Sequence, residues 1–192
     1  TYLVKSRNMR RADELISGMD STLLPIVNAT KDSIFPLIYK YTRAQLWTAP
    51  RMRMSRTVLK ELYAYEPVLW NIPAYWQSQR MINKDFILEY SYSRHGKEMK
   101  SALSQKPLTF GMLDSILSKD SLFAQDELRE MLIVQGIYDG FYSQLFSDGQ
   151  TDTLLITATN QAKTEQVRNL ALTIYNKKNH LKVGSNAPDF TL

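Results

Sequence analysis

One segment of the chain, residues 127–146, is apolar almost all the way round a helix, and it restricts the fold more than any other feature. Its apolar side chains do not keep to one face, as they would in a helix that lies on a surface. A helix of this kind is stable only when neighbours cover it on several sides. Leu132 and Tyr138 stand in the middle of the segment, and we expect both to be enclosed. The sequence therefore predicts a central helix surrounded by other helices.

The rest of the chain repeats amphipathic helical patterns with short breaks between them. Apolar residues recur at intervals of three and four, and Ser, Thr, Asp, Gly or Pro stand at the breaks. Only 7 Gly and 7 Pro occur in 192 residues, which is too few for the many tight turns of an all-β protein. We predict an all-α fold, a multi-helix bundle of about eight to ten helices that pack in pairs.

Several helix boundaries can be placed from local signals. Gly18 is expected to end the first helix, and residues 21–28 to form a connector around a proline. A single helix is expected over residues 73–95. Thr109 and Asp126 are expected to cap the helices that follow them, because their side chains can accept hydrogen bonds from the first free N–H groups.

The last ten residues, 183–192, break the helical pattern. Gly184 and Asn186 are turn residues, Pro188 cannot continue a helix, and the last four residues alternate between polar and apolar as a short strand does. We therefore expect one all-helical domain over residues 1–182, followed by a linker and a short extended tail over residues 183–192.

Residues suited to catalysis or metal binding are scarce. The chain has no cysteine, and its two histidines, His95 and His180, are far apart in sequence at expected helix ends. No zinc, calcium or phosphate-loop motif occurs. Asp126, Glu127 and Glu130 are explained as residues that suit the positive end of the central helix. We assign no catalytic, cofactor-binding or metal-binding residue, and without a thiolate the chain alone is not expected to exchange disulfides.

Aromatic residues gather in a short span that two prolines interrupt. They are Tyr63, Tyr65, Trp70, Tyr75 and Trp76. Tyr and Trp combine a large apolar body with a polar tip, and such residues serve as anchors in protein interfaces. One interpretation is therefore a partner surface. The other, which we favour, is a hydrophobic corner where two helices meet.

The positive charge of the chain is dispersed. The formal net charge is +5, but Lys and Arg are spread over several segments rather than gathered into one basic stripe. This distribution is typical of solvated helix faces, and we expect no nucleic-acid binding. No apolar run approaches the length of a membrane span.

The tail over residues 183–192 resembles the opening of thioredoxin-fold domains of the TlpA and AhpC/TSA-like (peroxiredoxin-like) kind. There, a Val/Gly-x-x-Ala-Pro-x-Phe-x-Leu segment leads into the first strand. Four earlier segments resemble, in the same order, parts of Bacteroidetes-type cell-envelope proteins with a C-terminal TlpA-like domain. They are residues 38–46, 67–75, 128–142 and 167–171. The ordered set covers residues 38–192.

This resemblance implies a periplasmic or cell-envelope protein, often a lipoprotein anchored ahead of Thr1, whose C-terminal domain handles thiols or disulfides. The present chain would be an accessory helical domain that positions the thioredoxin-like redox domain or presents envelope protein substrates to it. The alternative is a non-catalytic protein-interaction or structural module of the envelope. The partner implied first is the thioredoxin-like domain of the same protein, and no cofactor is implied for the helical part.

Overall fold

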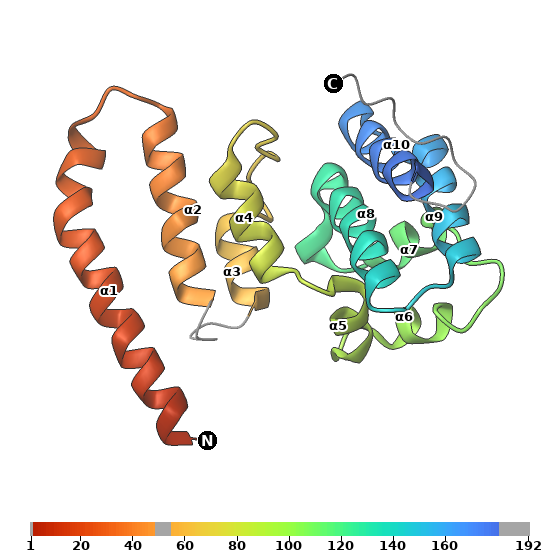
Figure 1. Cartoon of the computed structure of the whole chain (residues 1–192), viewed down its shortest axis with the longest axis horizontal. Coiled ribbons are helices and arrows are strands. Elements are labelled where there is room, and N and C mark those ends of the chain that lie inside the picture. The colour runs from red at the N-terminus through yellow and green to blue at the C-terminus, as the bar shows by residue number, and fades with distance from the viewer. Residues whose placement is uncertain (1, 49–54, 181–192) are drawn as a thin grey trace, which may run out of the picture. The chain divides into compact units, whose positions relative to one another are not determined.

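The computed structural model describes residues 2–48 and 55–180, and their regular structure is helical throughout (Figure 1). Within these ranges the chain forms ten α-helices and one 3₁₀ helix, and it forms no strand. The prediction of an all-α multi-helix fold is confirmed. The expected tail over residues 183–192 lies outside the described residues.

The chain divides into two compact units, Thr1–Lys84 and Asp85–Leu192, whereas the sequence predicted one domain over residues 1–182. Unit 1 contains α1 (Tyr2–Ala29), α2 (Ile34–Thr48), α3 (Ser55–Leu62) and α4 (Pro73–Ile82). Unit 2 contains α5 (Phe86–Tyr92), α6 (Lys97–Ala102), α7 (Phe110–Leu117), the 3₁₀ helix η1 (Ser121–Phe123), α8 (Asp126–Tyr142), α9 (Asp148–Gln161) and α10 (Glu165–His180).

The boundary between the units falls where one helix was predicted over residues 73–95, and that prediction is wrong. Asp85 adopts φ 55°, a left-handed conformation that separates α4 from α5. Aspartate tolerates this conformation better than most residues because its short polar side chain can bond locally. Its backbone N–H donates to the Asp139 carboxylate of α8 at 3.3 Å, so the turn is fixed to unit 2. The apolar periodicity continues through the turn and conceals it.

Helix α1 is continuous from Tyr2 to Ala29, so the predicted end at Gly18 and the connector over residues 21–28 are wrong. Ser21 and Thr22 donate their hydroxyls to the Gly18 carbonyl at 2.9 and 3.0 Å, which gives that oxygen local partners within the helix. Proline inside a helix removes one backbone donor and strains the preceding turn. Pro25 stands only four residues before the end of α1, where little helix remains to be disturbed.

Helices α1 and α2 pack side by side through buried Ala12 and Ile16 on α1. Asp20 of α1 joins them by polar contacts. Its carboxylate accepts a hydrogen bond from the Tyr39 hydroxyl and three from Nε and Nη2 of Arg43, the latter at 2.8 to 3.0 Å. The Arg43 pairing lowers the pKa of Asp20.

Unit 2 is built around α8, as predicted for a central helix. Every residue from 128 to 137 is buried, and α5, α7, α9 and α10 all contact α8. Leu132 has no exposed surface, whereas Tyr138, near the end of the helix, is only half-buried, so its predicted enclosure is wrong. A methyl group at Gly136 would lie 2.6 Å from the Ile87 side chain, so the glycine permits the close approach of α5.

The α8 helix ends at Tyr142, four residues earlier than predicted. Gln144 adopts φ 60°, and this left-handed residue turns the chain away from the helix axis. Phe146 is still buried, but it folds back against Gly140 from beyond the helix. Ser147 then caps α9 in a capping box with Gln150.

Candidate functional site

The predicted aromatic surface is divided between the core and the exterior of unit 1. Tyr63 and Tyr75 each have only 1% of their surface exposed, so they cannot form a partner surface, and that interpretation is wrong for them. Together with Tyr41 they form a cluster between α2, α3 and α4, with ring centroids 5.0 to 5.5 Å apart. For these two residues the alternative of a hydrophobic corner describes the structure.

Two phenols of the buried cluster, Tyr41 and Tyr63, are neutral. Burial raises the pKa of Tyr41 to about 12 and raises that of Tyr63 further. The Tyr63 hydroxyl donates to the Ser78 hydroxyl at 2.6 Å, which satisfies both polar groups in the core. These phenols therefore keep their protons at ordinary pH and stabilise packing rather than transfer protons.

Tyr65, Trp70 and Trp76 remain at the outside of unit 1. Tyr65 is 75% exposed, and the two tryptophans are half-buried. The Trp rings lie 5.1 Å apart, and the Trp76 indole N–H donates to the Trp70 carbonyl at 3.0 Å. This bond holds the loop between α3 and α4 against the start of α4, with aromatic surface next to water.

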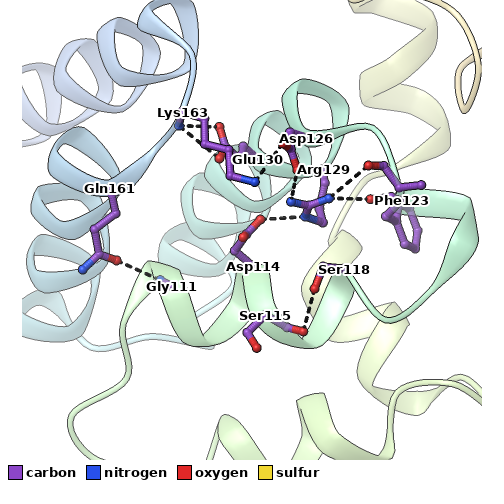
Figure 2. Close-up of polar contacts among 11 residues, drawn as sticks. Gly111, Asp114, Ser115, Ser118, Phe123, Asp126, Arg129, Glu130, Gln161 and Lys163 are labelled. Atoms are coloured by element: carbon purple, nitrogen blue, oxygen red, sulfur yellow. Dashed lines mark hydrogen bonds and ion pairs between the residues drawn. The ribbon is translucent and has the colours of Figure 1, made fainter.

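A buried ionic network, which the sequence analysis missed, connects α7, η1 and α8 in unit 2 (Figure 2). The Arg129 side chain is 3% exposed. Its guanidinium donates to the carboxylates of Asp114 and Asp126 and to the Phe123 carbonyl at 2.8 Å. The two carboxylates raise the pKa of Arg129 against the effect of burial, so the guanidinium stays charged.

Glu130, the next residue, fixes the turn between α9 and α10. Its buried carboxylate accepts the backbone N–H of Lys163 at 3.0 and 3.1 Å (Figure 2). The backbone N–H of Thr164 is a further donor to it. The Lys163 ammonium in turn pairs with Asp126 at 2.7 Å. Burial raises the pKa of Glu130 more than these hydrogen bonds lower it. Glu130 is therefore not the first-turn dipole residue that the sequence suggested, because it faces the core and a distant loop.

Asp126 also differs from its predicted role as a cap. Gln125 occupies the N-cap position of α8, and Asp126 is the first helical residue. Its carboxylate binds Lys163 and Arg129, and both partners lower its pKa. Thr109 does cap α7 as predicted, since its hydroxyl accepts the Met112 N–H at 3.4 Å.

The end of α10 is held by a second charged contact, which we call the Lys178 clamp. The Lys178 side chain is only 6% exposed. Its ammonium pairs with Asp152 of α9 at 2.8 Å and donates to the Asp148 carbonyl at 3.3 Å. It also lies 5.1 Å from the centre of the Phe141 ring of α8. The clamp therefore joins the last turns of α8 and α10 to the first turn of α9.

Chemical groups for catalysis do not converge in the part of the chain that the structure describes. Over residues 2–48 and 55–180 no group of three or more His, Asp or Glu side chains is arranged to hold a metal ion. His95 lies exposed after α5, and His180 ends α10. None of the described helices is both long enough and apolar enough to cross a membrane.

Two features of the described residues stand out. One is the outer aromatic group of unit 1, and the other is the end of unit 2 at which the Lys178 clamp holds α10. Comparison with known proteins adds no relative to either, because no protein-family model, curated protein or solved structure was found to match the chain.

Proposed function

We propose that this chain is the accessory helical region of a TlpA-type thiol-disulfide oxidoreductase of the cell envelope. Unit 2 would hold the thioredoxin-like domain that follows it. The proposal joins the resemblance of residues 183–192 to the first strand of such domains with one structural observation. That observation is the firm attachment of α10, the helix that leads directly into those residues.

The attachment of α10 is both apolar and ionic. Val167 and Ala171 have no exposed surface and pack the helix into unit 2. The Lys178 clamp secures it again only two residues before its end. If the end of α10 were frayed, the attachment point of the following domain would vary in position. Because α10 is fixed to within its last turn, that attachment point is defined. This supports a positioning role.

The buried charges of unit 2 also suit a scaffold. Arg129 is bonded to two carboxylates and a backbone carbonyl, and Glu130 is bonded to backbone N–H groups of the turn before α10. Groups satisfied in this way contribute to a unique packed arrangement and are not poised to exchange protons with a substrate. In the proposed enzyme, the thiolate that attacks a disulfide belongs to the downstream domain.

The first test is to read the coding sequence past residue 192. We expect a thioredoxin-like domain with a Cys-x-x-Cys motif some tens of residues later. A stop codon, or a sequence of another class, would contradict the proposal.

The second test concerns positioning and uses the whole protein. A six-residue Gly-Ser insertion after His180 should lower the rate of insulin disulfide reduction and leave the reaction with dithiobis(nitrobenzoate) unchanged. A flexible tether removes orientation without altering the thiol chemistry. The same insertion after Ser104, in an exposed turn that follows α6, is the matched control. Equal rates for the two insertion variants would argue against a positioning role.

The second candidate function, a non-catalytic interaction module, is favoured by one observation. Tyr65 is 75% exposed beside the half-buried pair of Trp70 and Trp76, and these residue types anchor protein interfaces. This function would be preferred if no redox domain follows residue 192. A Tyr65→Ser change should then weaken a purified complex at least tenfold, whereas the equally exposed Tyr92→Ser should not.

A further inference from the structure

Three aromatic residues gather where α8 ends, and we call them the α8 aromatic cluster: Tyr138, Phe141 and Tyr142. The Tyr142 ring lies 4.9 Å from that of Tyr138 and 5.1 Å from that of Phe141, in edge-on arrangements. Tyr142 is 63% exposed, while the other two are half-buried. A rigid group of rings with one exposed member matches the aromatic anchors found at the centres of protein interfaces.

Two hollows in the surface are lined in part by Phe141 and Tyr142 of the cluster. A depression of about 610 Å³ runs from Phe141 and Tyr142 along the turn to Gln150. A smaller hollow is lined by Tyr138 and by Ile174 and Lys177 of α10. The cluster therefore contributes to two depressions, one of which borders the last turns of α10.

The described part of unit 2 ends at this same place. The Lys178 ammonium lies 5.1 Å from the centre of the Phe141 ring, and the described part of α10 ends two residues later at His180. Twelve residues follow up to Leu192. Even fully extended they span no more than about 40 Å. Any domain that begins near residue 192 therefore starts within about 40 Å of the end of α10, so the cluster is within its reach.

When two domains are joined by a short linker, even a weak interface between them stays occupied. Linking two surfaces through a dozen residues gives an effective concentration in the millimolar range, so a small aromatic interface can stay occupied. The charge of Lys178 is balanced by Asp152, while Lys177 and Asp148 add one charge of each sign to the lining of the two hollows. A mixed surface of aromatic rings and balanced charges suits a folded domain better than a strongly charged ligand.

We propose that the α8 aromatic cluster is the docking surface for the thioredoxin-like domain that follows residue 192, with Tyr142 as its central anchor. This inference rests on the proposed function, since it names that domain as the occupant. It goes further by stating which face of unit 2 the domain contacts. Docking there would hold the redox domain in one orientation, beyond what attachment to α10 alone provides.

The test compares three forms of the whole protein: wild type, Tyr142→Lys and Tyr92→Lys. Tyr92 is a matched control, because it lies in the same unit and is 73% exposed. Small-angle X-ray scattering reports the distance between the helical part and the redox domain, and hydrogen exchange reports protection on both. We expect Tyr142→Lys to increase the radius of gyration and to raise exchange at least fivefold on one face of the redox domain. The Tyr92→Lys protein should behave as wild type.

The outcomes separate the two proposals. A redox domain that moves independently in the wild type, or equal behaviour of the two lysine variants, overturns the docking surface and leaves the accessory function standing. Protection that persists in Tyr142→Lys but disappears with Tyr65→Lys would place the interface on unit 1 instead. The absence of a thioredoxin-like sequence after residue 192 overturns both proposals.

Discussion

The two units are stabilised by different means. Unit 1 has a core of neutral tyrosines, in which Tyr41, Tyr63 and Tyr75 contact one another across three helices. Unit 2 has an aliphatic central helix, and it also buries a charged pair of neighbours, Arg129 and Glu130, at the start of that helix. The core of unit 1 therefore depends on the packing of aromatic rings. The core of unit 2 depends also on hydrogen bonds and ion pairs to its buried charged groups.

This difference affects how each unit responds to mutation and to pH. A neutral core tolerates the loss of one hydroxyl, because little electrostatic energy is at stake. A buried guanidinium is different, since removing it leaves carboxylates and carbonyls that were arranged around it without a partner. The chain provides a convenient way to observe the units separately. Its three tryptophans, Trp47, Trp70 and Trp76, all belong to unit 1, so tryptophan fluorescence follows unit 1 while far-UV circular dichroism follows both.

The largest effect should come from Leu132→Ala in the centre of unit 2. Leu132 has no exposed surface, and emptying such a site costs about 4 kcal/mol through lost burial and the remaining cavity. In urea unfolding, the dichroism transition should separate into two steps, with the tryptophan transition unchanged. Leu172→Ala, at a leucine of α10 that is 43% exposed, is the control and should cost less than about 1 kcal/mol. A tryptophan transition that shifts together with the dichroism would show that the units unfold as one.

Removing the guanidinium of the ionic network should have the next largest effect. Arg129→Met keeps the approximate length of the side chain but removes the donor to Asp114 and the Phe123 carbonyl and leaves Asp126 with Lys163 alone. We expect unit 2 to lose about 3 kcal/mol, at the lower end for a broken buried pair, because both carboxylates keep some contact with water. The exposed Arg168→Met on α10 should change stability by less than about 0.5 kcal/mol. Equal losses of unfolding free energy in Arg129→Met and Arg168→Met would mean that the ionic network does not stabilise unit 2.

The sequence predicts the aliphatic part of unit 2 well and its ionic part poorly. Residues 127–146 were recognisable as a central helix because apolar side chains surround it. That same pattern implies that Arg129 and Glu130, which stand within it, must be buried and therefore paired. The i, i+3 spacing of Asp126 and Arg129 is a usable local signal. The other partners, Asp114 and the Lys163 backbone, are 15 and 33 residues away in sequence, and only tertiary packing selects them.

In unit 1 the predictions that failed rested on local sequence signals, and the tertiary structure does not follow those signals. Gly18 has the usual chemistry of a helix end, but α1 continues through it, and open space surrounds it. The aromatic residues from Tyr63 to Trp76 were identified as a group, but composition cannot say which rings face inward. Tyr63 and Tyr75 are buried and Tyr65 is exposed, a difference that depends on the turn between α3 and α4.

A smaller effect is expected from Tyr63→Phe in unit 1. The change removes the hydroxyl that bonds to Ser78 at 2.6 Å and leaves the buried serine without its partner. We expect a loss of about 1 kcal/mol in the tryptophan-detected transition. The double variant with Ser78→Ala should recover most of this loss, because both polar groups are then absent. Additive losses in the double variant would show that the two hydroxyls do not depend on each other.

The smallest effect is expected on the pH dependence of the unfolding free energy. Removing one carboxylate from each unit should change this pH dependence with opposite signs in the two units. Burial raises the pKa of Glu130 in unit 2, so the folded state holds this proton more tightly than the unfolded state, whose pKa is about 4.3. The stabilisation from protonated Glu130 is complete below that value and is lost as pH rises through the folded pKa. Glu130→Gln should therefore flatten a decline in unit 2 stability that begins as pH rises above the unfolded-state value. In unit 1 the Arg43 pairing lowers the pKa of Asp20, so its contribution is present at neutral pH and lost in acid. Asp20→Asn should then remove an acid-induced loss from the tryptophan transition, and parallel pH curves for wild type and either variant would contradict the assignment for that unit.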